Sequence, residues 1–187
     1  MSLTLAVVTV STRPGRKGPL FAAWFAAHAR DHGAFEVKEI DLAEIALPIF
    51  DEPEHPMKGL YQHEHTKRWS AAIAPADAIV FVMPEYNYMP PPSFFNAVNY
   101  LHREWGYKPV GFVSYAGLSG GTRAVQAAKP ILTTVKAMPI PEQVAVPAFF
   151  EHLGPSGFEA KEPHRSSATQ MLNELKKWAE ALKVLRA

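Results

Sequence analysis

The sequence predicts an α/β fold: one open parallel sheet of five strands in the order 2-1-3-4-5, with helices on both faces. Apolar, valine-rich runs alternate along the chain with segments of helical periodicity, and this pattern demands right-handed crossovers onto a parallel sheet. The chain has 187 residues, no repeat and no dividing linker, so we expect one domain over residues 1–187. Five strands fit this order better than a six-stranded dinucleotide-binding domain or an eight-stranded barrel.

The strands are expected where the chain is apolar and β-branched. Leu3–Val10 and Asp77–Met83 are nearly continuous apolar runs, which is typical of strands buried on both faces. Three further strands are expected at Phe35–Leu42, Pro109–Tyr115 and, more weakly, Gln143–Phe149.

The helices are expected between these strands. Pro19–Arg30 carries apolar residues at helical spacing, so Phe21, Trp24 and Phe25 are expected in the core rather than on a ligand. Proline is tolerated in a first helical turn, so Pro90–Pro92 lead into a helix at Ser93–Trp105. The other expected elements are an irregular loop at Pro48–Gly59 and helices at Leu60–Ala74, Gly121–Met138 with a kink at Pro130, and Ser166–Leu185.

The amino-acid composition excludes several classes of partner and of chemistry. Lys and Arg number 19 against 18 Asp and Glu, which gives no electrostatic reason to expect nucleic acid or an anionic membrane as a partner. Cysteine is absent, so disulfides, thiolate metal ligands and a cysteine nucleophile are excluded. We find neither a transmembrane run nor the features of a signal peptide, and expect a cytoplasmic protein.

The candidate site lies in three loops. In an open parallel sheet, ligands bind outside the carboxyl ends of the strands, where the strand order reverses. The loops there are Ser11–Pro19 (STRPGRKGP), Pro84–Pro92 (PEYNYMPPP) and Ala116–Arg123 (AGLSGGTR). Because the topology brings these loops to one edge, we expect them to form a single site.

The first loop has the chemistry of a phosphate site. It offers hydroxyls, the cations Arg13 and Arg16, glycines and a helix N-terminus, all of which suit a phosphate monoester. It is neither a Walker loop nor a GxGxxG motif. The alternative is an ordinary polar turn between a strand and a helix.

The other two loops suit a flat ligand. Aromatic side chains after the third strand would pack on a ring, and Asn87 would bond to its edge. Glycines after the fourth strand permit close approach of the backbone. The alternatives are a proline-fixed turn whose tyrosines cap the core, and a flexible glycine turn.

Together, STRPGR, PEYN and SYAGLSGGTRA resemble the NADPH-dependent FMN reductase family, which has a flavodoxin-like three-layer sandwich and includes quinone, azo-dye and chromate reductases. The resemblance runs from about Val7 to Ala124. It implies that the FMN phosphate is held by Ser11, Arg13, Arg16, Gly18, Pro19 and Leu20. It implies that the isoalloxazine is lined by Pro84, Glu85, Tyr86 and Asn87, and closed on its other side by Ser114, Tyr115 and Gly117.

The chain departs from the family pattern in three places. The helix after PEYN often carries LKNAID in the family, whereas residues 94–99 read FFNAVN here. Val10 stands where a glycine is usual, and Ala116 interrupts the usual SYGG. If the backbone at Ala116 had a positive φ, alanine would cost about 1 kcal/mol and reshape the contact with the flavin.

The resemblance implies an NAD(P)H-dependent FMN or quinone reductase. NADPH or NADH would pass a hydride to bound FMN, which would then reduce a flavin, quinone or similar acceptor in a ping-pong cycle. The loops contain no triad or carboxylate pair, so no catalytic side chain is expected. The alternatives are an FMN-binding electron carrier of flavodoxin type and a binding protein without turnover, although carriers are usually strongly acidic.

The resemblance also implies a homodimer or homotetramer, and we expect contact surfaces at Tyr86–Phe95 and Tyr100–Tyr107. His63 and His65 resemble a metal pair, but two residues apart on a helix would place the rings on opposite sides, so no metal site is expected. In the last helix, the side expected to pack on the sheet comprises Leu172, Leu175, Trp178, Leu182 and Leu185.

Overall fold

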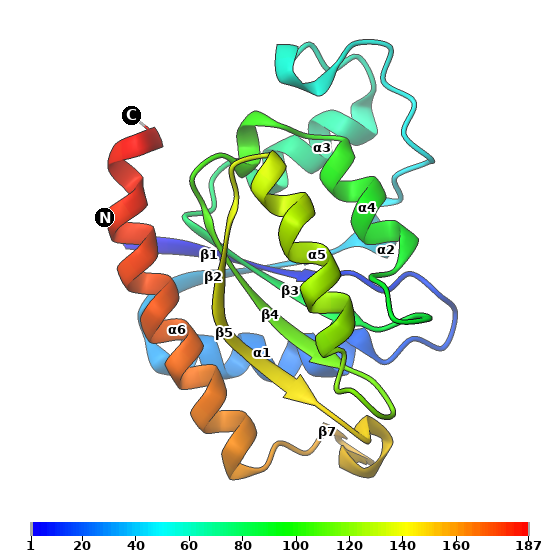
Figure 1. The fold of residues 1–187 in the computed structure, drawn as a ribbon, viewed down its shortest axis with the longest axis vertical. Helices are drawn as coiled ribbons and strands as arrows, with labels where there is room; N and C mark the ends of the chain where they lie inside the picture. Colours follow the sequence, from blue (N-terminus) through cyan, green and yellow to red (C-terminus); the bar gives the residue numbers. More distant parts are fainter. Residues whose placement is uncertain (1, 187) are drawn as a thin grey trace.

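The computed structural model describes residues 2–186 and contains the predicted sheet. Five parallel strands lie in the order β2-β1-β3-β4-β5, which confirms the fold class (Figure 1). The strands are β1 (Leu3–Thr9), β2 (Phe35–Asp41), β3 (Ala78–Pro84), β4 (Pro109–Tyr115) and β5 (Met138–Val146). A short antiparallel hairpin, β6 (Leu153–Gly154) and β7 (Gly157–Phe158), follows the sheet.

The helices form the two outer layers. They are α1 (Gly18–His32), α2 (Leu42–Ile45), α3 (Glu64–Ile73), α4 (Pro92–Asn99), α5 (Thr122–Thr134) and α6 (Glu162–Leu182). Helices α1 and α6 cover one face of the sheet, and α3, α4 and α5 cover the other (Figure 1). Single turns of 3-10 helix occur at Pro56–Lys58, Arg103–Trp105, Phe149–His152 and Lys183–Arg186.

Alternation along the strands explains the two cores. Leu5 and Val7 of β1 belong to the cluster under α1 and α6, whereas Ala6 and Val8 belong to the cluster under the other helices. Because both faces are covered, every residue of β3 and of β4 is buried. Phe21 and Phe25 are fully buried, as predicted.

Strand β5 begins and ends earlier than the predicted Gln143–Phe149. Pro139 and Pro141 lie within β5, which is an edge strand, where a missing N–H is tolerated. The strand stops before Ala148, whose φ of +43° is incompatible with an extended chain. The preceding helix, predicted to reach Met138, ends at Thr134, and Lys136 then adopts a φ of +61°.

Three other predicted helices are wrong at one end. Helix α3 begins at Glu64 rather than Leu60, because the buried Glu52 carboxylate accepts from the backbone N–H groups of Gln62 and His63. Helix α4 ends at Asn99 and is followed by a separate 3-10 turn. Helix α6 begins before the predicted Ser166, with a proline in its first turn, where proline is tolerated.

The buried side of α6 differs from the prediction. It consists of His164, Ala168, Met171, Leu172, Leu175 and Ala179. Trp178 and Leu185 are 37% and 53% exposed, so neither packs fully on the sheet. Within residues 2–186, no helix combines the length and the apolar character that a bilayer crossing demands.

Candidate functional site

The three predicted loops meet at the carboxyl edge of the sheet. Glu85 of the second loop accepts a hydrogen bond from Ser119 Oγ of the third at 2.7 Å. Tyr115 Oη, at the end of β4, lies 3.5 Å from Ser11 Oγ of the first loop. Ser93 Oγ, which follows the second loop, donates to the Val10 carbonyl at 2.7 Å. We call residues 11–19, 84–92 and 116–123 together the loop cluster.

Arg16 braces the first loop. Its Nη1 donates to the Ser11 carbonyl at 2.8 Å and to the carboxylate of Asp41 at the end of β2. The hydrogen bond to Asp41 is the main reason that the pKa of Arg16 is raised. Arg16 is therefore held within the protein, whereas Arg13 on the same loop is exposed.

The start of α1 packs tightly against the first strand and its loop. A Cβ at Gly18 would lie 2.3 Å from Ser11 Oγ and 3.2 Å from Tyr115 Oη, so only glycine fits without movement. Lys17 provides no side-chain cap, and Pro19 has no N–H. The positive end of the α1 dipole thus opens onto the loop, where it suits an anion.

The second loop contains a strained turn. Tyr86 and Met89 exchange both backbone hydrogen bonds at 2.9 Å, and the residues between them, Asn87 and Tyr88, have φ of 49° and 70°. Two central residues at positive φ define a type I′ turn, which favours asparagine and glycine but not tyrosine. The Tyr88 ring is 64% exposed and lies under the Arg123 guanidinium, 3.8 Å from its centroid.

Glu85 faces the third loop rather than open space. Its side chain is 4% exposed and accepts from Ser119 Oγ, from Arg123 Nε at 2.7 Å, and from the backbone N–H groups at the start of α5. Burial alone would raise the pKa of Glu85, but hydrogen bonds from Ser119 and Arg123 outweigh burial and lower it. The Glu85 carboxylate therefore positions the third loop, and the expectation that Glu85 lines a flavin ring stays a prediction.

The side chains of Ser114 and Tyr115 are also turned inward, and the expectation that these residues close the other side of a flavin ring stays a prediction. Ser114 is fully buried and donates to the Gly120 carbonyl at 2.7 Å. The Tyr115 ring stacks on Phe21 with centroids 4.3 Å apart, and burial raises the pKa of Tyr115 to about 12. Their role is to fix the floor below the third loop.

The departures from the family pattern at Val10 and Ala116 do not disturb the backbone. Val10 is a fully buried continuation of β1, and its N–H donates to the Val82 carbonyl at 3.0 Å. The left-handed residues of the third loop are Gly120 and Gly121, whereas Ala116 lies outside that region. A Cβ at Gly117 would meet nothing within 4 Å, so this position has open space in front of it.

Arg123, Ser119 and Tyr88 lie in the predicted loops but were not among the predicted ligand-binding residues, and their contacts hold the loop cluster together. The sequence does contain a signal for Arg123. Glu85 directly follows a buried strand, where a carboxylate needs a partner, and Arg123 is the cation in the first helical turn after the glycines of the third loop. The segment after β5 was also missed: the Ala148 N–H donates to the Gly117 carbonyl at 3.0 Å, and the Phe149 ring lies 5.5 Å from that of Tyr115.

Comparison with known proteins gives the family. Residues 3–151 match the family model described as NADPH-dependent FMN reductase. The chain belongs to this family. An NAD(P)H-dependent FMN reductase of Schizosaccharomyces pombe is 39% identical over 124 residues, covering 65% of this chain and 62% of that protein. A second, from Nectria sp., is 36% identical over 151 residues, covering 76% of this chain and 74% of that protein.

Solved structures agree on the fold of this FMN reductase family member. A flavoenzyme NAD(P)H:(acceptor) oxidoreductase of Paracoccus denitrificans superposes with a TM-score of 0.76 at 20% identity, covering 96% of this chain and 98% of that one. An azoreductase of Bacillus anthracis superposes with a TM-score of 0.57 at 16% identity, covering 95% and 98%. At these identities the likeness establishes the fold alone.

The histidine pair differs from the prediction. His63 precedes α3 instead of lying in it, so its ring stacks on that of His65 with centroids 5.1 Å apart. His65 Nε2 lies 3.0 Å from the Asp51 carboxylate. In the described part of this family member, no three histidine or carboxylate side chains are grouped to hold a metal ion.

Part of one predicted contact surface lies in the core. Within the segment Tyr100–Tyr107, the side chains of Tyr100 and Trp105 are fully buried in this chain and cannot meet a partner. The segment Tyr86–Phe95 does expose Tyr88 and Met89, which belong to the loop cluster.

Proposed function

We propose that this chain binds FMN in the loop cluster and uses it to pass a hydride from NADPH or NADH to a flavin, quinone or similar small acceptor. The proposal covers the whole chain as one FMN-binding domain. The observation that carries it is the mutual contact of the three loops at the edge where ligands bind in open parallel sheets. Family membership supports it further.

The residues present fit the phosphate of FMN. The N-terminus of α1 has no side-chain cap, and the exposed Arg13 and Thr12 lie on the loop that leads into it. Arg13 supplies a guanidinium fork and Thr12 a hydroxyl, while the helix supplies its dipole. Arg16 acts indirectly, because it holds the loop in place through Ser11 and Asp41.

The other two loops fit a flat ring. Asn87 and Tyr88 are exposed on a tight turn, and the backbone at Gly117 is open to close approach. Bound FMN would supply the hydride-accepting and hydride-donating chemistry. The chain's own contribution is to orient the ring, through a turn that Glu85 and Arg123 hold rigid, and to exclude water with exposed aromatic side chains.

The test is anaerobic reconstitution. When NADPH or NADH is added to the purified chain mixed with FMN, the yellow absorbance of the flavin should bleach. Parallel lines in double-reciprocal plots of initial rate, measured at several concentrations of a quinone acceptor, would establish the ping-pong order. At 100 to 1,000 times Kd, FMN should raise the free energy of unfolding by about 2–4 kcal/mol. Stabilisation by FMN without bleaching would replace the proposal with an electron carrier or a binding protein.

We further propose a homodimer or homotetramer and, from the sequence, a cytoplasmic location. Four apolar side chains around the loop cluster are exposed by 47–85%: Tyr88, Met89, Leu118 and Phe150. Covering such side chains with a second copy would remove apolar surface from water. Light scattering on the FMN-loaded chain measures the assembly, and a monomer at micromolar concentration would contradict it.

A further inference from the structure

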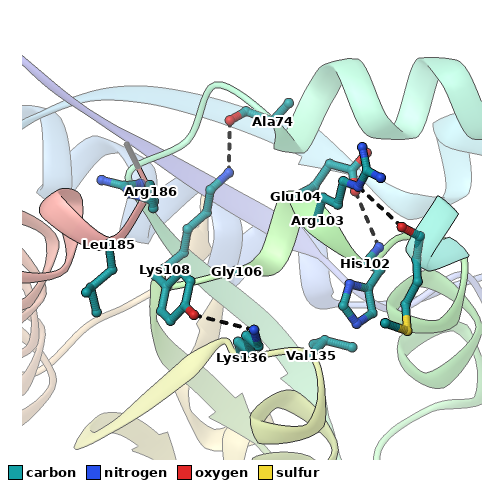
Figure 2. A pocket seen from close by; sticks show the side chains of 12 residues that line it. Ala74, His102, Arg103, Glu104, Gly106, Lys108, Val135, Lys136, Leu185 and Arg186 are labelled. Atoms are coloured by element: carbon teal, nitrogen blue, oxygen red, sulfur yellow. Dashed lines mark hydrogen bonds between the residues drawn. The ribbon is translucent and has the colours of Figure 1, made fainter. Parts of the chain in front are cut away.

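A second groove lies at the opposite edge of the sheet from the loop cluster. It is bounded by the residues that precede β4 and β5, the end of α3 and the last turn of the chain (Figure 2). Its volume is about 690 Å³, within the range of small-molecule sites. Its walls include Tyr107, Lys108, Val135, Lys136 and Leu185.

Lys108 is a buried cation that makes no direct ion pair within the described residues. Its side chain reaches from the groove to the end of α3, and the residue is only 4% exposed (Figure 2). Nζ donates to the neutral carbonyls of Ile73 and Ala74, both at 2.9 Å, which uses two of its three donors. Among residues 2–186, no carboxylate oxygen lies within 4.0 Å of Nζ. Buried charges are normally paired, so this ammonium lacks an anion in direct contact.

The rest of the groove is also cationic. Arg103, Lys136 and Arg186 line it with Lys108, against a single carboxylate, Glu104. Glu104 already accepts hydrogen bonds from the hydroxyls of Tyr61 and Ser70, and Arg186 is paired with Asp77 at 2.9 Å. The groove thus has four cationic side chains and one carboxylate, whereas the whole chain has 19 Lys and Arg residues and 18 Asp and Glu residues. Positive charge is therefore concentrated in this groove.

Two strained residues shape the groove. Tyr107 and Lys136 have φ of 58° and 61°, and the Tyr107 N–H donates to the Lys136 carbonyl at 2.8 Å. Left-handed backbone at bulky residues is costly and concentrates at functional sites. Tyr107, Val135 and Leu185 give the groove an apolar wall beside its cations.

We propose that this groove binds a small organic anion: a carboxylate or phosphate accepts the remaining N–H of Lys108, and its apolar body lies on Tyr107, Val135 and Leu185. The site is separate from the loop cluster, and the proposal does not depend on flavin reduction. Burial and the nearby charge of Arg186 lower the pKa of Lys108 to about 8, although the carboxylates of Glu104 and Asp77 act in the opposite direction. An anion bound beside Nζ should raise that pKa, so binding at pH 8 should take up protons.

The experiment is calorimetric titration of the full chain with benzoate, phenyl phosphate and inorganic phosphate, with excess FMN present to occupy any phosphate site in the loop cluster. Measurements at pH 8 in two buffers of different ionisation enthalpy give the protons taken up. We expect benzoate or phenyl phosphate to bind one site with net proton uptake, and the tighter of the two identifies the anionic group. Inorganic phosphate should bind at least tenfold more weakly.

Lys108→Met should weaken binding about tenfold or more and abolish proton uptake. Should that variant fail to fold, Lys136→Gln on the groove wall should weaken binding by a smaller factor. Lys67→Gln is the matched control, because Lys67 is an exposed cation on α3 that pairs with Glu64 outside the groove. No organic anion binding, equal binding of inorganic phosphate, or full affinity in every folded groove variant would each overturn the proposal.

Discussion

The Arg123 guanidinium joins the Glu85 carboxylate, with Nε to Oε1 at 2.7 Å, while it also covers the Tyr88 ring at 3.8 Å from the centroid. One side chain at the start of α5 therefore holds the second loop at two points. The first is a buried carboxylate, and the second is a turn whose φ values a tyrosine rarely adopts. The shape of the loop cluster thus depends on an arginine that sequence reasoning did not select.

Arg123→Met should destabilise the chain. It leaves the 4% exposed Glu85 carboxylate without its cation and removes the cation–π contact with Tyr88. Breaking a fully buried pair costs about 3–5 kcal/mol, but Arg123 is 40% exposed, so we expect about 1–3 kcal/mol. Urea unfolding followed by circular dichroism measures the loss. Lys129→Met on the same helix is the control, and an equal loss in both variants would contradict the expectation.

The pH dependence of stability should reflect Glu85. Its folded pKa is lowered below the ordinary value of 4.5, so the carboxylate stabilises the fold at higher pH and loses that contribution as pH falls through the folded pKa. Glu85→Gln should therefore be less stable than the parent at pH 7. The two free energies of unfolding should converge as the pH falls below the folded pKa of Glu85.

The parent must be compared with Glu85→Gln because the pKa values of Asp51, Glu52 and Glu64 are also lowered. These carboxylates contribute to the loss of stability of the parent at acid pH as well. Urea unfolding at several pH values measures the difference. A gap between parent and Glu85→Gln that stays constant from neutral to acid pH would show that the charge of Glu85 is not involved.

Two glycines of the loop cluster should behave in opposite ways. Gly18→Ala places a Cβ 2.3 Å from Ser11 Oγ and 3.1 Å from Thr9 Cγ2, so the loop must shift, at a cost of about 1–3 kcal/mol. Gly117→Ala meets nothing within 4 Å, and its stability should stay within about 0.5 kcal/mol of the parent. Under the proposed function, Gly117→Ala should nevertheless weaken FMN binding, because the methyl group occupies space for the ring. Unchanged FMN affinity in Gly117→Ala would remove this residue from the site.

The architecture was predictable because it depends on local patterns. Nearly continuous apolar runs define β1 and β3, and the alternation of strands with helices defines the parallel sheet. The convergence of the three loops then follows from topology alone. Side-chain directions depend on long-range packing, which no local pattern reports. The Tyr115 ring points inward because it stacks on the Phe21 ring of α1. The Glu85 carboxylate points inward because Arg123 and Ser119 donate hydrogen bonds to it.

The second groove was beyond the reach of sequence reasoning for the same reason. Its cations come from the segment before β4, the segment before β5 and the end of the chain, which only the folded sheet brings together. Lys108 looks like an ordinary lysine before a strand, and only the carbonyls at the end of α3 reveal that it is buried.

Arg13 and Arg16 should separate into a ligand-binding and a bracing residue. Arg13 is exposed and makes the proposed phosphate contact, so Arg13→Met should lower FMN affinity about tenfold and leave stability unchanged. Arg16 is tied to Ser11 and Asp41, so Arg16→Met should cost about 1–2 kcal/mol of stability.

Riboflavin, which has the same ring without the phosphate, distinguishes the two roles in a fluorescence titration. The Arg13→Met effect should vanish with riboflavin, whereas the Arg16→Met effect should persist with both ligands because the loop itself has moved. An Arg13→Met variant equally impaired for riboflavin would place this arginine against the ring or in the fold, and would leave the α1 N-terminus as the phosphate site.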